Sequence, residues 1–286
     1  MTKYIRREVF PMPELSRRVQ TFTDSVIRRM TRINDMTPGS INLSQGFPDF
    51  DPPKEILEAL KAAAEHGPHQ YSITFGAKNF RDALADMYTK KWNRPIDPDK
   101  EIVVTCGGTE AMMAAMMTVC NPGDKVAVFS PFYENYGADA ILSGADPIYI
   151  PLVPPDFYYD RAVLEQAFRD GAKALILCNP SNPCGKVFTM GEMEEIAELA
   201  KRYDAFVITD EVYEYIIYDG NRHISMAALP GMYERTITCS SLSKTYSMTG
   251  WRLGYAACNE EIVKTVNKLH QHVVTCATSF VQKAGV

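Results

Sequence analysis

Lys244 lies in a stretch of the chain whose side chains could bind a phosphorylated aldehyde. The stretch runs Ser241-Leu-Ser-Lys-Thr-Tyr-Ser-Met-Thr-Gly-Trp-Arg252-Leu-Gly254. A lysine amine can form a Schiff base with an aldehyde, while the hydroxyls of Ser241 and Ser243 and the Arg252 guanidinium can bind a phosphate. A single lysine indicates little, because most lysines are solvated surface groups. Other polar clusters must therefore accompany Lys244 if it belongs to a site.

A glycine pair supplies a second candidate for anion binding. The apolar run 101–105 is followed by Cys106-Gly-Gly-Thr-Glu110 and then by a segment rich in Ala and Met. Two glycines allow a ligand to approach the backbone, and the free N–H groups at a helix start attract anions. Taken alone, the motif fits an ordinary strand-to-helix turn with Thr109 as N-cap slightly better.

Two other apolar runs end in residues that could contact a planar heteroaromatic ring. Run 125–129 leads to Tyr133, which could stack on a ring, although an aromatic residue here is more often simply packed. Run 205–209 leads to Asp210, a carboxylate that is costly to bury without a partner. A protonated pyridine nitrogen would be such a partner, and the Tyr213 hydroxyl could reach the neighbouring ring oxygen.

The loop after run 174–178 exposes amide side chains. It reads Asn179-Pro-Ser-Asn182-Pro-Cys-Gly185, and two closely spaced Asn-Pro steps with a glycine predict an irregular loop. Such a loop can place an amide toward a ligand, or it can be only a turn.

Alternating strand-like and helix-like segments must position these clusters, and they predict a parallel sheet covered by helices. Ligands bind outside the carboxyl ends of the strands in such sheets, so we expect the clusters to converge on one small molecule. The proline-rich segment 147–155 is interpreted as an exposed connection. The expected strands are 101–105, 125–129, 174–178, 205–209, 236–240 and 253–258, of which the last need not be parallel. The expected helices are 54–66, 79–91, 109–119, 190–203 after a capping box at Thr189 and Glu192, and one from Glu260.

Composition narrows the class of protein. The chain has 286 residues, 46% of them hydrophobic and 23% charged, as in an ordinary globular protein. Its net charge of −5 argues against nucleic acid as a partner. No apolar run approaches the ~18 residues of a membrane span. The arginines near the start, between Arg6 and Arg32, are interleaved with acids and predict a solvated helix. Seven scattered cysteines without a Cys-x-x-Cys pair predict no zinc or other metal site and a reducing, cytoplasmic compartment.

Together, the ordered motifs resemble the pyridoxal 5′-phosphate-dependent aminotransferases of class I/II, in the aspartate/aromatic/kynurenine/methionine branch of fold type I. The resemblance runs from Asn42-Leu-Ser-Gln-Gly46 to Ser279-Phe-Val-Gln. It implies a three-layer α/β/α fold with a mostly parallel sheet and helices on both faces. Residues 46–286 would form the large cofactor-binding domain, and residues 1–45 would belong to an incomplete small domain.

The resemblance also implies a role for each motif. Lys244 would form the internal aldimine and shuttle the proton, while Asp210 would pair with the pyridinium nitrogen. Asn182 and Tyr213 would bind the 3′-oxygen, Tyr133 would stack on the ring, and Asn182 and Gly46 would line the substrate. The phosphate would be held by Gly108, Thr109, the backbone N–H of Glu110, Ser241, Ser243, Arg252 and, from the neighbouring subunit of a homodimer, Tyr71.

The activity that this resemblance implies is amino-group transfer between an L-amino acid and a 2-oxo acid. A C–S β-lyase on the same scaffold and a cofactor-binding but inactive truncated chain are the alternatives. Family members continue beyond the equivalent of Val286 and carry there an arginine for the substrate α-carboxylate, which no arginine of this sequence matches. We therefore expect the chain to be a fragment of a longer gene product, with apolar surface exposed where the remaining domain would pack.

Overall fold

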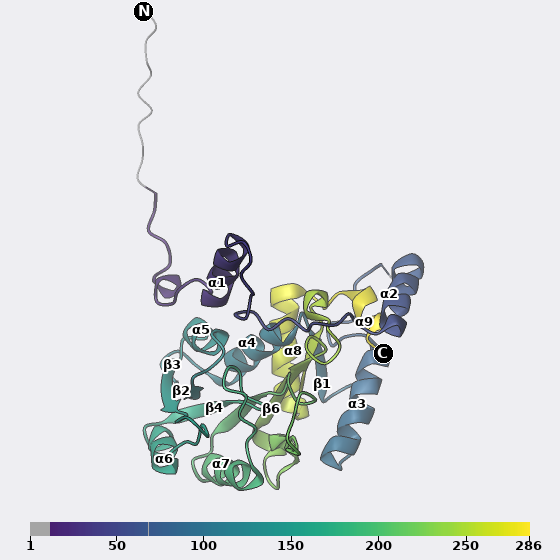
Figure 1. Ribbon diagram of the computed structural model, residues 1–286. Coiled ribbons are helices and arrows are strands. Elements are labelled where there is room, and N and C mark those ends of the chain that lie inside the picture. The colour runs from purple at the N-terminus through teal and green to yellow at the C-terminus, as the bar shows by residue number, and fades with distance from the viewer. Residues whose placement is uncertain (1–11, 68) are drawn as a thin grey trace, which may run out of the picture.

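A computed structural model of the chain describes residues 12–67 and 69–286. In this part, seven strands form one sheet in the order β1-β7-β6-β5-β4-β2-β3 (Figure 1). β7 runs antiparallel to both of its neighbours, and all other pairs are parallel. The strands are β1 (Ile102–Thr105), β2 (Lys125–Ser130), β3 (Asp146–Pro151), β4 (Ala172–Cys178), β5 (Phe206–Asp210), β6 (Thr236–Ser241) and β7 (Gly254–Ala257).

Helices cover both faces of the sheet, so the predicted α/β/α layering is confirmed (Figure 1). One face carries α4 (Gly108–Val119), α5 (Asn135–Leu142) and α8 (Glu260–Val274). The opposite face carries α3 (Lys78–Trp92), α6 (Arg161–Arg169) and α7 (Met190–Arg202). The remaining helices are α1 (Val26–Asp35), α2 (Lys54–His66), α9 (Ser279–Ala284) and the 3₁₀ turns η1 (Arg17–Gln20), η2 (Met226–Ala228), η3 (Tyr233–Arg235) and η4 (Thr249–Trp251).

The strands are buried on both faces, which explains their continuous apolar runs. In β4, Ala174 and Ile176 pack toward α4 and α5, whereas Leu175 and Leu177 pack toward α6 and α7. Because successive side chains of a strand point to opposite faces, such a run fills two separate cores at once.

The predicted helices and strands occur within a few residues of their expected bounds. Thr189 and Glu192 form the expected capping box at the start of α7. The interpretation of residues 147–155 as a connection is wrong at its start, because Pro147 to Pro151 lie in β3. β3 is an edge strand that pairs with β2 alone among the described residues, and prolines are tolerated where no second partner needs their N–H.

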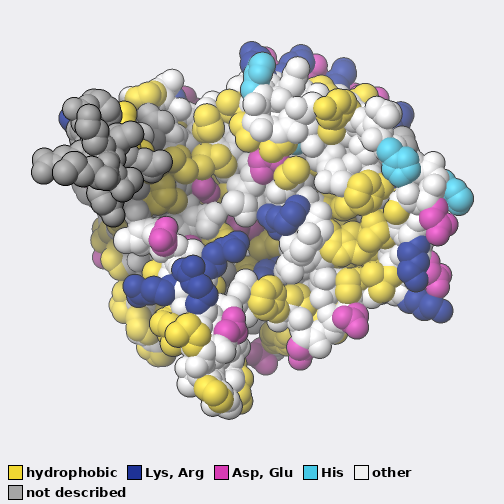
Figure 2. All heavy atoms as spheres, turned by 90° about the horizontal axis from the view of Figure 1, so that it is seen from above, with side chains coloured by type: hydrophobic (Ala, Val, Ile, Leu, Met, Phe, Trp, Pro, Cys, Tyr) yellow, Lys and Arg dark blue, Asp and Glu magenta, His cyan; other side chains and the backbone are white. Residues whose placement is uncertain are grey.

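The N-terminal part of the described chain leaves large hydrophobic side chains exposed. Helix α1 buries none of its residues, and its arginines are exposed as expected for a solvated helix; Arg6 and Arg7 lie outside the described residues. Figure 2 shows the molecule from above, with hydrophobic patches open beside Lys and Arg side chains. The exposed residues from α1 to the start of α3 include Met30, Ile33, Met36, Ile41, Leu43, Phe47, Phe50, Tyr71 and Ile73.

Two further observations concern the sequence predictions about membrane spans and cysteines. None of the helices in the described ranges combines the length and apolar composition that crossing a bilayer requires. All seven cysteines, from Cys106 to Cys276, are free thiols. Four of them, at 120, 178, 239 and 258, are buried, as small hydrophobic side chains are.

Candidate active site

The carboxyl ends of the central parallel strands bring several predicted site residues together. Cys178 at the end of β4 is paired with Asp210 at the end of β5, and Asp210 with Cys239 of β6. β7 starts where β6 and β1 end, because it is antiparallel to both: Gly254 is paired with Ser241 on one side and with Thr105 on the other. The lysine stretch and the glycine pair, far apart in sequence, thus meet at one edge of the sheet.

Gly107, Gly108, Ser241 and Arg252 form a small cradle of hydrogen-bond donors. A Cβ added to Gly107, whose φ is +83°, would overlap the Arg252 guanidinium, so that side chain lies directly on this backbone. A Cβ on Gly108 would lie 3.8 Å from Ser241 Oγ. The arrangement joins a guanidinium, a hydroxyl and the unpaired first N–H groups of α4, which together suit an anion.

Helix α4 begins at Gly108, and its N-cap is Gly107, so the alternative interpretation with Thr109 as the cap is wrong. Glu110 turns its side chain away from the cradle. One carboxylate oxygen, Oε2, accepts the Cys106 N–H at 2.6 Å, and Oε1 lies 2.7 Å from Nδ1 of the buried His270 on α8. Sequence reasoning missed His270.

Lys244 is partly buried, and its Nζ donates a hydrogen bond to the Gly46 carbonyl oxygen at 2.6 Å. This contact joins the lysine loop to the N-terminal segment, and it brings two predicted residues together across almost two hundred positions. Burial lowers the pKa of the Lys244 ammonium, so the neutral, nucleophilic amine is easier to form than on a surface lysine. Ser243 beside it is buried.

Asp210 is held by two hydrogen bonds. The Tyr136 hydroxyl donates to Oδ2 at 2.7 Å, and the Val212 N–H donates to Oδ1 at 3.2 Å. Burial outweighs these hydrogen bonds and raises the pKa of Asp210, so the carboxylate gains from a nearby cation. Tyr136 also meets the ring of Tyr133 edge-on, with centroids 5.7 Å apart. Sequence reasoning missed Tyr136, although its spacing of three from Tyr133 could have indicated it.

Asn182 and Tyr213 also lie close together. The Asn182 amide donates to the Tyr213 hydroxyl at 3.4 Å. Burial raises the pKa of Tyr213, which keeps its hydroxyl protonated. Tyr71, in contrast, is 82% exposed and has no hydrogen bond to the other predicted residues in the described part of the chain.

Asp139 is a buried carboxyl group that the sequence did not single out. It is 2% exposed, and its Oδ2 has no hydrogen-bond partner in the described residues. On α5 it follows Tyr136 by three positions, so both side chains are on one helix face. Burial, with a smaller contribution from Asp210, raises the pKa of Asp139 from 3.8 to about 7.

We expect the substitution Asp139→Asn to stabilise the fold at pH 8, by on the order of 2 kcal/mol. The folded pKa is above the unfolded one, so ionisation of Asp139 costs stability progressively from about pH 4 to pH 7. The gain should therefore be present at pH 8 and vanish near pH 4. Urea unfolding at both pH values measures it, with exposed Asp86→Asn as control; equal midpoints for Asp139→Asn and wild type at pH 8 would contradict the argument.

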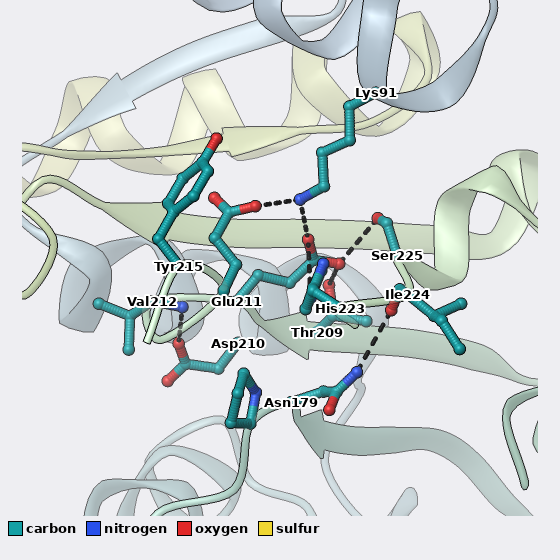
Figure 3. A network of polar contacts seen from close by, with 12 residues as sticks. Lys91, Asn179, Thr209, Asp210, Glu211, Val212, Tyr215, His223, Ile224 and Ser225 are labelled. Atoms are coloured by element: carbon teal, nitrogen blue, oxygen red, sulfur yellow. Dashed lines mark hydrogen bonds and ion pairs between the residues drawn. The ribbon is translucent and has the colours of Figure 1, made fainter. Parts of the chain in front are cut away.

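A buried ion cluster joins the turn after Asp210 to helix α3 (Figure 3). Lys91 of α3 forms ion pairs with Glu211, at 2.8 Å, and with Glu214. His223 Nε2 lies 3.5 Å from Glu211, and Ser225 Oγ donates to Glu211 at 2.8 Å. Burial alone would lower the pKa of Lys91, but the two carboxylates outweigh it and raise that pKa. Glu211 is thus the structural carboxylate of the pair Asp210–Glu211.

Comparisons with known proteins agree with this geometry. The family model "Aminotransferase class I and II" matches residues 38–286. The chain is 40% identical over 253 residues to mouse kynurenine–oxoglutarate transaminase 3, covering 84% of this chain but only 56% of that protein. It is 36% identical over 272 residues to aromatic-amino-acid aminotransferase 2 of Thermococcus litoralis, covering 95% of this chain and 70% of that one.

Solved structures give the same result. N-succinyldiaminopimelate aminotransferase from Mycobacterium tuberculosis superposes with a TM-score of 0.90 at 35% identity, covering 95% of this chain and 71% of that one. The Escherichia coli protein YbdL, reported with a methionine aminotransferase function, gives a TM-score of 0.89 at 32% identity, over 96% of this chain and 71% of that one. The predicted fold type is therefore confirmed, and the chain belongs to the class I and II aminotransferase family.

Proposed function

We propose that this chain carries the cofactor site of a pyridoxal 5′-phosphate-dependent aminotransferase that acts on an L-amino acid and a 2-oxo acid. The observation that carries the proposal is the convergence of Lys244, Asp210 and the Gly107–Arg252 cradle at one edge of the sheet. The chain spans 56% of the length of the mouse transaminase, so the activity of the whole protein belongs to the proposal too.

The residues present fit the cofactor. Its phosphate matches the cradle of Gly108, Ser241 and Arg252, where the absence of a Cβ at Gly107 lets the Arg252 guanidinium lie against the backbone. Its ring nitrogen matches Asp210, a carboxylate whose raised pKa favours pairing with a cation. An amine of lowered pKa, that of Lys244, suits its aldehyde.

When bound, pyridoxal phosphate supplies an aldehyde for the amino group and a ring that accepts electrons from the substrate α-carbon. Lys244 takes up and returns the substrate α-proton at Nζ, a role that its lowered pKa favours. Asp210, oriented by Tyr136 and Val212, keeps a proton on the ring nitrogen. Asn182 and Tyr213, which are joined by a hydrogen bond, would donate to the ring oxygen, and Tyr133 would orient the ring by stacking.

The remaining assignments complete the proposal. Thr109, the Glu110 N–H and Ser243 join the phosphate cradle, and Gly46 and Asn182 line the substrate. Exposed Tyr71 would reach the phosphate of a second copy in a homodimer. Residues 46–286 would form the large domain, and residues 1–45 would belong to the small one.

A titration with pyridoxal phosphate tests the proposal. We expect saturable binding with an absorbance change that borohydride makes permanent, together with a mass increase on the peptide that contains Lys244. Addition of an L-amino acid should then yield the matching 2-oxo acid and the amino form of the cofactor, both measured by mass spectrometry. Aromatic, aspartate and methionine substrates form the panel, since enzymes so named are among the relatives.

The outcomes separate the competing functions. Formation of pyruvate and ammonia from a cysteine S-conjugate, with no 2-oxo acid added as amino acceptor, would replace the transaminase by a C–S β-lyase. Cofactor binding without any amino form would indicate a binding module. Labelling at a lysine other than Lys244 would overturn the site itself.

A further inference from the structure

Glu110 accepts a hydrogen bond from the loop that precedes its own helix. It is the third residue of α4, after the N-cap Gly107. A glutamate there usually accepts the N–H of the N-cap residue itself, as Glu192 does with Thr189 at the start of α7. Glu110 instead reaches one residue further back and accepts the Cys106 N–H at 2.6 Å. It therefore closes a ring around the two glycines of the cradle.

The second oxygen of Glu110 anchors this ring to a different helix. Oε1 lies 2.7 Å from His270 Nδ1 in α8, a helix that packs against α4. His270 is 0% exposed, and its other nitrogen, Nε2, has no hydrogen-bond partner in the described residues. A buried imidazole with one unsatisfied nitrogen is costly, so the contact with Glu110 is the polar interaction that holds its orientation.

The contact between Glu110 and His270 also affects the charge at the N-terminus of α4. A free carboxylate in the first turn of α4 would interact favourably with the helix end and compete there with a bound anion. In this structure both Glu110 oxygens point to Cys106 and His270, and the side chain is 11% exposed. The N–H groups of Gly108 and Thr109, in the first turn of α4, thus stay available for a ligand. The Arg252 guanidinium lies beside them and donates through Nη1 to the Thr249 carbonyl oxygen at 3.0 Å.

We propose that Glu110 and His270 are positioning residues that brace the Cys106–Gly108 loop from the protein interior and keep the α4 terminus open to an anion. Gly107 has a positive φ, and neither glycine has a side chain to pack. Apart from the brace, the loop is held by Thr105, whose hydroxyl donates to the Gly107 carbonyl oxygen at 3.0 Å and whose carbonyl oxygen accepts the Gly107 N–H at 2.8 Å. The anion named here, the phosphate of pyridoxal phosphate, rests on the proposed function; the brace does not.

Amide hydrogen exchange on the chain without added ligand tests the brace directly. We expect Glu110→Ala and His270→Phe to speed exchange in the peptide covering 105–108 by about tenfold or more, since each removes one link of the brace. His270→Gln keeps an N–H donor and should retain much of the protection. Glu192→Ala is the matched control: it removes a glutamate that caps α7 through a backbone N–H and should leave exchange at 105–108 unchanged.

A binding measurement then connects the brace to the anion. The dissociation constants of pyridoxal phosphate and of inorganic phosphate should rise by about tenfold in Glu110→Ala and stay constant in Glu192→Ala. Unchanged exchange at 105–108 in both Glu110→Ala and His270→Phe would overturn the brace, as would an equal effect of Glu192→Ala. Failure of the wild type to bind either compound would instead overturn the proposed function.

Discussion

Replacing Lys244 with alanine is expected to lower the rate of 2-oxo acid formation by more than about 10³-fold, because the proposed function makes this one amine both nucleophile and proton carrier. The loss should be chemical rather than structural. Lys244 is only partly buried, and its hydrogen bond to the Gly46 carbonyl is its one such contact in the described residues. The unfolding midpoint of Lys244→Ala should therefore remain close to that of the wild type.

Lys244→Arg provides the matching control for charge. Arginine can keep the hydrogen bond to Gly46 and the positive charge, but it does not deprotonate in proteins and cannot take up the α-proton. We expect it to be as inactive as the alanine variant in the mass-spectrometric assay. A Lys244→Ala variant that forms the 2-oxo acid within tenfold of the wild-type rate would show that another residue does this chemistry.

Replacing Lys91 with methionine is expected to reduce the free energy of unfolding by about 3–5 kcal/mol, the usual cost of leaving buried charges uncompensated. Glu211 and Glu214 expose 1% and 4% of their side chains, and Lys91 is the cation that forms an ion pair with each of them. The deficit should shrink as the pH falls, because protonation of the two carboxyl groups removes the repelling charges. Urea unfolding at pH 8 and at pH 5 measures this dependence.

The adjacent, exposed Lys90 offers a control on the same helix. Lys90→Met should change the free energy of unfolding by less than about 0.5 kcal/mol, as most surface substitutions do. Adding Glu211→Gln and Glu214→Gln to Lys91→Met should recover part of the loss. If Lys91→Met and Lys90→Met unfold at the same urea concentration, the cluster does not hold the turn after Asp210.

The sequence predicted those features that depend on local pattern. Continuous apolar runs indicated buried parallel strands, and the capping box at Thr189 placed the start of α7 correctly. The joining of Asn182 to Tyr213 and of Lys244 to Gly46 agrees with the motif assignments. The proximity of Asn182 and Tyr213 could be anticipated because the carboxyl ends of parallel strands share one edge of a sheet. Gly46 lies outside the sheet, and its contact with Lys244 could not be anticipated in this way.

The sequence could not predict partners that depend on three-dimensional packing. Asp139 and His270 lie on helices whose apolar neighbours hide them in the sequence pattern, and their roles appear only once α5 and α8 are packed beside the sheet. Lys91 resembles a surface lysine next to Lys90 until α3 is placed behind β5. The strand β3 was missed for a different reason, since its prolines are acceptable only at a sheet edge.

The antiparallel strand β7 also sets an order of events during synthesis. In the described chain, β1 has a single sheet partner, β7, and Thr105 pairs with Gly254. A ribosome adding ~5–20 residues per second needs about 8–30 s to cover the roughly 150 residues between them. During that interval, the backbone groups of β1 that pair with β7 have no partner strand. A ribosome-bound chain whose synthesis is arrested before β7 should therefore bind chaperones. A chain arrested after residue 257 has emerged should bind them less.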